Sequence, residues 1–245
     1  MGLSKNQVKL ITSLQQKKYR QKHKLFVAEG IKVVHELLNS SLQVDTLYVV
    51  EDFELKESSQ FKTVSITQED LKKVSTLKTP NKVLGVFKIP DEIPVNREGL
   101  IVALDAINDP GNLGTIIRLC DWFGISQLLC SKNTVDCYNQ KVIQATMGSI
   151  TRVQINYVDL VSFIDEADEN VFAADMDGEN VYKTELPNQG ILVMGNEANG
   201  ISSAINDLIN KKLTIPRFGK TQQTESLNVA TATAILLSEF KRGLK

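Results

Sequence analysis

Short apolar runs alternate with amphipathic segments along most of the chain. In the first third, the runs "LFVAEG", "DTLYVV", "FKTVSI" and "KVLGVFKI" predict strands, and "IKVVHELLNS" and "TQEDLKKVS" predict helices. Ser4 and Gln7 predict a capping box at the start of an earlier helix. This alternation favours a small α/β domain with a largely buried sheet.

The second part of the chain shows stronger strand signals and follows a polar stretch. Residues 91–99 contain Pro94, three acids and almost no apolar periodicity, so we place a linker there. Beyond it, the expected strands are 100–107, 126–131, 151–158, 171–176, 191–195 and 212–216. The expected helices are 113–123, 137–147, 160–167, 202–209 and 228–242. Continuous apolar strands that alternate with helices predict a parallel sheet covered on both faces.

The composition is that of an ordinary globular protein, with 42% hydrophobic and 23% charged residues. No apolar run approaches the roughly 18 residues of a membrane-spanning helix, and the first residues lack the apolar core of a signal peptide. We therefore expect a cytoplasmic protein that makes no contact with a membrane. The three cysteines form neither a CxxC pair nor an even set, so we expect reduced thiols.

The charge is unevenly distributed, although the net charge is only −1. Residues 1–24 carry seven Lys or Arg and no Asp or Glu. Such a stretch is either a contact for a polyphosphate or the solvated face of a helix. We expect a basic extension at 1–24, a first domain at 25–90, the linker at 91–99 and a second domain at 100–245. The candidate contacts for the polyphosphate are Lys17, Lys18, Arg20, Lys22 and Lys24.

Several common sites are excluded by the residues themselves. There are only two histidines, His23 and His35, so neither a Ser-His-Asp triad nor a histidine-rich metal site is expected. The "FGKT" at 218–221 is not a P-loop, because Thr214 stands where the motif requires its first glycine. No GxGxxG follows the first strand of either domain. We expect no metal.

Polar loops follow three of the apolar strands in the second domain. Ligands of parallel α/β sheets collect outside the carboxyl ends of the strands, so these loops could form one pocket. Asn112 is expected near the N-cap of the helix after the first loop. The loops are "NDPGNLGTIIRLCDWFG" (108–124), "VMGNEANGIS" (193–202) and "IPRFGKTQQTESLNVATA" (215–232).

In this order, "DPGNLGTIIR", "VMGNEANGIS" and "IP…ESLNVATATAILL" resemble the motifs of the SpoU (TrmH-like) ribose 2′-O-methyltransferases of the SPOUT superfamily. The resemblance covers almost all of residues 100–245. "KLFVAEGIKVVHELL" resembles the start of the substrate-binding domain found in many members, which is similar in fold to certain ribosomal-protein RNA-binding domains.

The resemblance implies an α/β domain with a deep trefoil knot, an exception to the rule that chains do not knot. Small residues of the last helix, Ala230, Ala232 and Ala234, would let chain segments pass closely. A homodimer is also implied. S-adenosylmethionine would lie in the knot, bound by Met194, Gly195, Ile215, Pro216, Leu227 and Asn228.

The resemblance implies a catalytic role for Arg118, with Asn112, Glu197, Ser226 and Asn228 organising the site. Guanidinium normally stays protonated. Arg118 would therefore either bind a substrate phosphate and position the hydroxyl, or be deprotonated transiently with help from that phosphate. The loop between Gly219 and Ser226 is longer than is usual in the family.

The expected activity is 2′-O-methylation of RNA, and the additional first domain favours ribosomal RNA by analogy. Transfer RNA is the alternative substrate. A non-catalytic RNA-binding or ribosome-associated protein that keeps the knot is the alternative from another class. The presence of Asn112, Arg118, Glu197, Ser226 and Asn228 counts against loss of activity.

Overall fold

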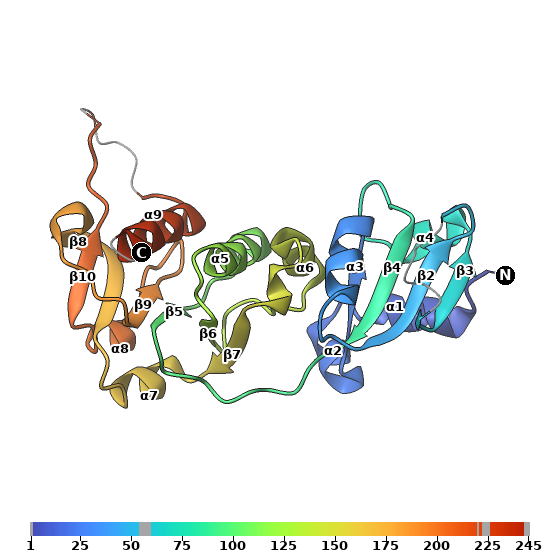
Figure 1. Ribbon diagram of the computed structural model, residues 1–245, viewed down its shortest axis with the longest axis horizontal. Helices are drawn as coiled ribbons and strands as arrows, with labels where there is room; N and C mark the ends of the chain where they lie inside the picture. The colour runs from blue at the N-terminus through green and yellow to red at the C-terminus, as the bar shows by residue number, and fades with distance from the viewer. Residues whose placement is uncertain (1, 54–59, 220, 222–225, 243–245) are drawn as a thin grey trace. The chain divides into compact units, whose positions relative to one another are not determined.

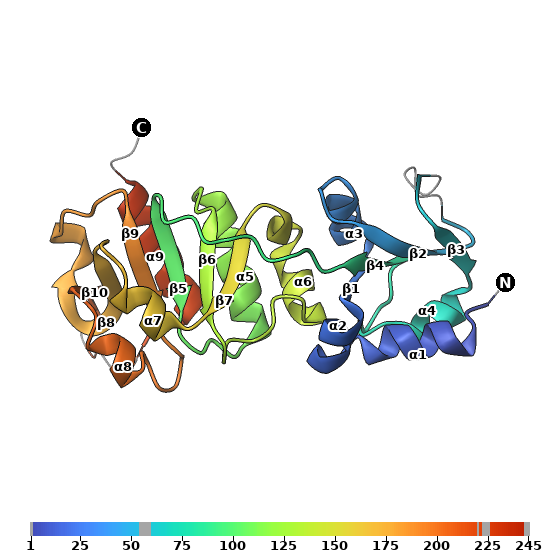
Figure 2. The ribbon, with the colours of Figure 1, turned by 90° about the horizontal axis from the view of Figure 1, so that it is seen from below.

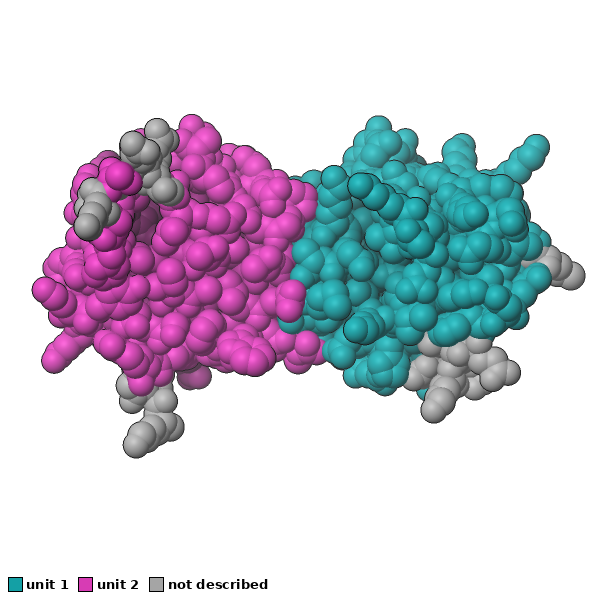
Figure 3. Space-filling model, turned by 90° about the horizontal axis from the view of Figure 1, so that it is seen from above, with its two compact units in different colours: residues 1–92, 136–151 teal, residues 93–135, 152–245 magenta. Residues whose placement is uncertain are grey.

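The computed structural model of the chain describes residues 2–53, 60–219, 221 and 226–242 (Figure 1). The chain divides into two compact units, which Figure 3 colours separately. Unit 1 comprises residues 1–92 and 136–151, and unit 2 comprises residues 93–135 and 152–245. Within the described residues, no helix is long and apolar enough to cross a membrane.

Unit 1 contains a mixed four-stranded sheet in the order β1-β4-β2-β3. Strand β4 is antiparallel to β1 and β2, while β2 and β3 are parallel. The strands are β1 (Leu25–Glu29), β2 (Val44–Val50), β3 (Thr63–Ile66) and β4 (Val83–Lys88). The four strands predicted for this part of the chain are therefore confirmed.

The helices of unit 1 are α1 (Lys5–Ser13), α2 (Lys17–His23), α3 (Ile31–Leu38), α4 (Gln68–Val74) and α6 (Gln140–Thr146), with a 3-10 turn at Ser149–Thr151. The predicted capping box is present, because the Ser4 hydroxyl accepts from Gln7 N and the Gln7 side chain accepts from Ser4 N. Thr67 caps α4 in the same manner by accepting from Asp70 N.

The core of unit 1 lies where α1 and α4 pack on the sheet. Ile11 and Leu14 at the end of α1 contact Leu71 and Val74 of α4 and apolar side chains of the strands, including Val27. The fully buried Val33, Val34 and Leu37 belong to α3. Apolar side chains on one stripe of each helix therefore provide the hydrophobic stabilisation that the periodicity predicts.

Residues 136–151 are grouped with unit 1 although the sequence pattern places them in the second domain. The Tyr138 ring packs on Phe26 of β1 with 4.8 Å between centroids. The Gln140 side chain donates to Glu29 Oε1 at 2.7 Å. The Arg20 guanidinium binds the Asp136 carboxylate. Segment 136–151 thus completes the packing of unit 1 from a distant part of the sequence.

Unit 2 contains a parallel six-stranded sheet in the order β10-β8-β9-β5-β6-β7. The strands are β5 (Leu100–Leu104), β6 (Gln127–Ser131), β7 (Gln154–Val158), β8 (Val171–Asn180), β9 (Gly190–Met194) and β10 (Lys211–Thr214). The predicted parallel sheet is confirmed. Strand β8 continues to Asn180, beyond the expected end at residue 176.

Helices cover both faces of this sheet (Figures 1 and 2). They are α5 (Pro110–Trp122), α7 (Leu160–Asp165), α8 (Ser203–Asn206) and α9 (Val229–Lys241). Helices α5 and α9 pack against each other, as do α7 and α8. Leu160, Ile164 and Ile205 of the second pair share a core with Ile101 and Val193 of the sheet.

The order of the strands positions the site. From β5, the chain builds the sheet outward through β6 and β7 and then returns to build the other side with β8, β9 and β10. The direction of building therefore reverses between β5 and its neighbour β9. In open α/β sheets, ligands bind outside the carboxyl ends of the strands at such a reversal.

Candidate active site

The three polar loops predicted to meet do come together at the carboxyl ends of the strands. Asn112 of α5 donates from Nδ2 to Glu197 Oε1 at 2.6 Å. Asn228 donates from its Nδ2 to Asn112 Oδ1 at 2.9 Å. These two hydrogen bonds join side chains that are 85 and 116 residues apart in the sequence.

Asn112 is the third residue of α5, so it lies near the N-cap of this helix, as the sequence predicted. The N-cap is Asp109, whose Oδ1 accepts from Asn112 N at 2.8 Å. Pro110 occupies the first helical position, where its missing N–H costs nothing and its fixed φ suits a helix. The expected start at residue 113 was therefore late by three residues. The first turn leaves the Asn112 amide free to bind the other two loops.

Asn228 has two tasks at the start of α9. Its Oδ1 accepts from Ala230 N at 3.0 Å and from Thr231 N at 3.2 Å, which caps the helix. Its Nδ2 is therefore directed to Asn112. The amide has a donor and an acceptor on separate atoms, so one side chain can both cap α9 and bind α5.

The loop that carries Glu197 is held by two residues that the sequence analysis did not single out. Asn196 pairs with Gly200 through backbone hydrogen bonds, and its Nδ2 donates to Ala106 O at 2.7 Å. Asp105 accepts from Ser202 N at 2.8 Å. Asp105 directly follows the buried strand β5, and Asn196 follows the buried strand β9 with one residue between. That position is the signal that could have identified them.

Gly195 has a local structural role in this loop. A Cβ at Gly195 would lie 2.5 Å from the Gly200 carbonyl carbon, too close for any side chain. Gly200 itself has φ +68°, in the left-handed region that favours glycine. The two glycines therefore let the loop fold back tightly on itself behind Glu197.

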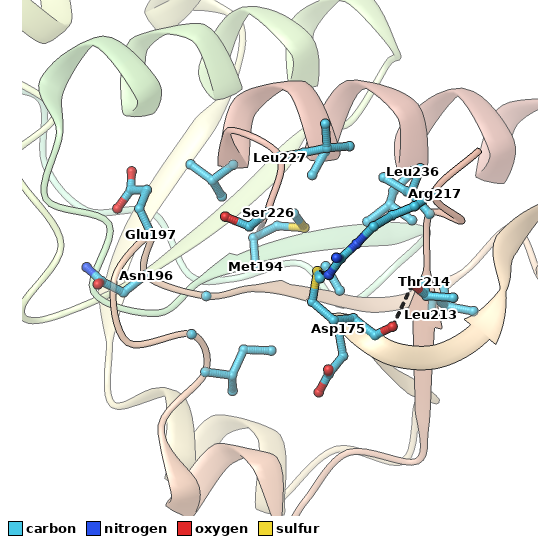
Figure 4. Close-up of a pocket in the computed structure, with 18 of the residues that line it drawn as sticks. Asp175, Met194, Asn196, Glu197, Leu213, Thr214, Arg217, Ser226, Leu227 and Leu236 are labelled. Atoms are coloured by element: carbon cyan, nitrogen blue, oxygen red, sulfur yellow. Dashed lines mark hydrogen bonds between the residues drawn. The ribbon is translucent and has the colours of Figure 1, made fainter. Parts of the chain in front are cut away.

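A cavity of about 590 Å³ opens beside this network in unit 2. Figure 4 shows Glu197 and Asn196 on one side of it and Arg217 and Leu236 on the opposite side. Its size lies within the range of small-molecule sites. Predicted cofactor and catalytic residues that line it are Met194, Gly195, Glu197, Ile215, Ser226 and Leu227. Pro216, Asn112, Arg118 and Asn228 are not among its lining residues.

The cavity also has walls that the sequence analysis did not foresee. Its further lining residues include Met176 within β8, Leu236 of α9 and the segment Arg217–Phe218 after β10. Asp175 lies in the same wall, and its hydrogen bond with Lys212 lowers the pKa of that carboxyl below its ordinary value. Asp175 is therefore ionised at neutral pH.

Arg118 lies on the exposed surface of α5, between one and two turns beyond Asn112. Within the described ranges, its guanidinium makes no hydrogen bond or ion pair. The described residues also contain no cluster of His, Cys, Asp and Glu that could hold a metal ion. Arg118 is thus an accessible cation on the helix that begins the site.

The basic residues of the N-terminal stretch differ in exposure. Lys17, Lys18, Lys22 and Lys24 are exposed on or just after α2. Arg20 is only 2% exposed, and it donates to Asp136, to Leu14 O and to Gln15 O. A buried guanidinium with these partners cannot contact RNA, so Arg20 is removed from the candidate RNA contacts.

Comparisons with known proteins match both units. The SpoU rRNA Methylase family matches residues 99–238, and the MRM3-like substrate binding domain matches residues 5–85. The chain is 30% identical to the 23S rRNA (guanosine(2553)-2'-O)-methyltransferase RlmP of Bacillus subtilis, over 97% of each chain. Over 60% of its length, it is 32% identical to the mitochondrial rRNA methyltransferase 3 of Xenopus laevis, of which that match covers 38%.

Solved structures agree with these matches. A TrmH-family protein from Porphyromonas gingivalis superposes with a TM-score of 0.86 at 37% identity, over 99% of this chain and 100% of that one. An AdoMet-bound rRNA methyltransferase from Sinorhizobium meliloti gives a TM-score of 0.88 at 28% identity, over 100% and 97%. The resemblance inferred from the three loops is confirmed, and the chain belongs to the SpoU rRNA methylase family.

Proposed function

We propose that this protein transfers the methyl group of S-adenosylmethionine to a ribose 2′-hydroxyl of ribosomal RNA. The observation that carries the proposal is the network Glu197–Asn112–Asn228, which joins the three family motifs beside the cavity. The match to RlmP extends over 97% of both chains and includes the first unit, which favours ribosomal over transfer RNA.

The cavity suits the cofactor in size and in chemistry. Met194, Ile215, Leu227 and Leu236 give it apolar walls on which an adenine ring can pack. The backbone at Gly195 lies in the same wall, where N–H and C=O groups can bind the edge of a base. When bound, S-adenosylmethionine supplies a methyl group on a positively charged sulfur, which is a good leaving group.

The residues of the chain then have to align the hydroxyl and dispose of its proton. Arg118 binds a phosphate of the RNA strand and so positions the ribose; guanidinium is well suited to phosphate. Glu197 and Ser226 line the cavity, and a carboxylate or hydroxyl oxygen there can accept a hydrogen bond from the 2′-hydroxyl. Asn112 holds the Glu197 carboxylate in place through the 2.6 Å hydrogen bond.

Four further features belong to the proposal. The chain is threaded as a trefoil knot, although the loop that would have to be traced includes residues 220 and 222–225, which lie outside the described residues. Two copies form a homodimer through the second unit, as the resemblance to the family implies. The protein acts in the cytoplasm, where its RNA is found. Lys17, Lys18, Lys22 and Lys24 contribute to RNA binding.

The test is incubation of the full chain with methyl-labelled S-adenosylmethionine and, separately, unmodified ribosomal RNA, ribosomal subunits and transfer RNA. Mass spectrometry of nuclease digests identifies the labelled nucleoside. Label on a ribose of ribosomal RNA, free or in subunits, supports the proposal. Label in transfer RNA alone would refute the proposed substrate, and label on a base would refute the proposed chemistry. Absence of label from all three pools would favour the non-catalytic alternative.

A further inference from the structure

Two aromatic side chains lie together at the rim of the cavity. Tyr182 and Phe218 have ring centroids 6.5 Å apart and planes inclined by only 26°, which is a stacked arrangement. Phe218 is 83% exposed and Tyr182 is 37% exposed. An aromatic pair that is exposed at the rim of a ligand cavity is available to stack on a further ring.

The position of the pair is determined by the sheet. Asn180 at the end of β8 pairs with Thr214 at the end of β10. Tyr182 follows Asn180 by two residues, and its N–H donates to Asn180 Oδ1 at 3.0 Å. The preceding Val181 is fully buried and anchors this turn. The two rings therefore come from segments that follow two neighbouring strands. The hydrogen bond to Asn180 and the burial of Val181 fix the backbone position of Tyr182.

The exposed face of the Tyr182–Phe218 pair lies outside the cavity. Phe218 is one of the residues that line the cavity, whereas Tyr182 is not. The pair thus extends from the rim outward, and most of the Phe218 ring faces solvent. A cofactor enclosed in the cavity would cover little of this surface. The occupant has to approach from outside, as an RNA substrate does.

Arg217 supplies a positive charge in the same cavity wall as Phe218. Arg217 precedes Phe218, and its side chain extends toward the middle of the cavity (Figure 4), with Nη2 3.6 Å from the Met176 sulfur. The acids of this edge are partly balanced, since Asp175 pairs with Lys212 and Glu179 with Lys211. A guanidinium in the cavity next to this rim can contact a phosphate of an RNA that approaches the aromatic pair.

We propose that Tyr182 and Phe218 form a stacking platform for an unpaired nucleobase of the RNA substrate, close to the ribose that is methylated. This inference rests on the proposed function. Proteins recognise single-stranded RNA by stacking its bases on aromatic side chains. A base on the open face of Phe218 extends the existing stack to three rings and covers the exposed apolar surface. The proposal therefore gives a function to Phe218, the first residue of the "FGKT" sequence that is not a P-loop.

The test compares Phe218→Ala, Phe218→Leu and Phe218→Trp in the full chain, with Val161→Ala as a matched control. Val161 is an exposed apolar residue of α7, outside the cavity lining. Stacking of one base is expected to change kcat/KM for RNA roughly 5- to 150-fold. Phe218→Ala and Phe218→Leu should show this loss, whereas Phe218→Trp and the control should keep the wild-type value. Calorimetric affinity for S-adenosylmethionine should stay unchanged in all of them.

A second readout does not depend on catalysis. Substrate RNA with 2-aminopurine near the modified position should lose fluorescence on binding to the wild-type protein, and much less on binding to Phe218→Ala. If the wild-type protein binds RNA without methylating it, the proposed function fails while this comparison still decides the platform. Equal quenching by both proteins would overturn the platform. Weaker cofactor binding by Phe218→Ala would also overturn it, because the aromatic pair would then cover the cofactor. A changed oligomeric state in light scattering would do the same, because the pair would then contact a second copy of the chain.

Discussion

Arg20 and Asp136 form a buried ion pair, so removal of either partner alone should destabilise unit 1. Arg20 is 2% exposed, and its guanidinium donates to Asp136 Oδ2 through Nε at 2.8 Å. Through Nη1 it also donates to Leu14 O at 2.8 Å and Gln15 O at 2.9 Å, which are carbonyls at the end of α1. One side chain therefore ties the end of α1 to segment 136–151.

The perturbation is Arg20→Met, which retains an apolar stem and removes the charge. The substitution removes the counter-charge of the Asp136 carboxylate, whose side chain is only 14% exposed. It also removes the donor to the carbonyls of Leu14 and Gln15. Loss of one partner of a buried pair costs about 3–5 kcal/mol. Lys18→Met is the matched control on the exposed face of α2 and should change stability by less than about 0.5 kcal/mol.

The assay is urea unfolding followed by far-UV circular dichroism, combined with hydrogen exchange of the β1 amides. Hydrogen exchange of the β5 amides reports unit 2 separately. Arg20→Met should reduce the protection of the β1 amides and leave that of the β5 amides nearly unchanged. Asp136→Asn should have a comparable effect, because it leaves the guanidinium buried without its counter-charge.

The double variant decides whether the two groups act together. Arg20→Met with Asp136→Asn should cost less than the sum of the single changes, because it no longer leaves an isolated charge. Additivity within about 0.5 kcal/mol would refute the reasoning. The RNA assay gives an independent check: the salt dependence of RNA affinity should be unaffected by Arg20→Met and should flatten when Lys17 and Lys18 are replaced by Ala.

Further predictions concern the site and the buried thiol. Arg118→Ala should abolish methylation and leave calorimetric binding of S-adenosylmethionine intact; loss of binding would show that Arg118 acts on the cofactor instead. Asn228→Ala should lower the free energy of unfolding by about 1 kcal/mol through loss of the α9 cap, while Asn228→Asp should restore the cap but not methylation, since it lacks the donor for Asn112. Burial raises the pKa of the Cys120 thiol to about 12, so at pH 8 only roughly one part in 10⁴ is thiolate. Iodoacetamide should therefore leave Cys120 unmodified in the native protein and label it in urea; rapid native labelling would contradict its burial.

Local patterns in the sequence were sufficient for most of the fold. The strands of unit 2 were identified because a strand buried on both faces reads as a continuous apolar run, as in "LIVAL" and "ILVM". The cap by Ser4 was identified because a capping box is an interaction between residues three apart. The convergence of three loops followed from a general property of parallel sheets, whose carboxyl ends share one edge.

Other features were decided only by the tertiary structure. Arg20 was grouped with the surface lysines because it stands among them in the sequence. Its partner Asp136 is 116 residues away, so no local pattern could predict the ion pair. The grouping of residues 136–151 with unit 1 has the same cause, since it depends on contacts with Phe26 and Glu29. Likewise, the rings of Tyr182 and Phe218 meet only because β8 and β10 are neighbours in the sheet. Periodicity and capping report interactions within a few residues, whereas the partner of a buried charge or an aromatic ring is set by how distant segments pack.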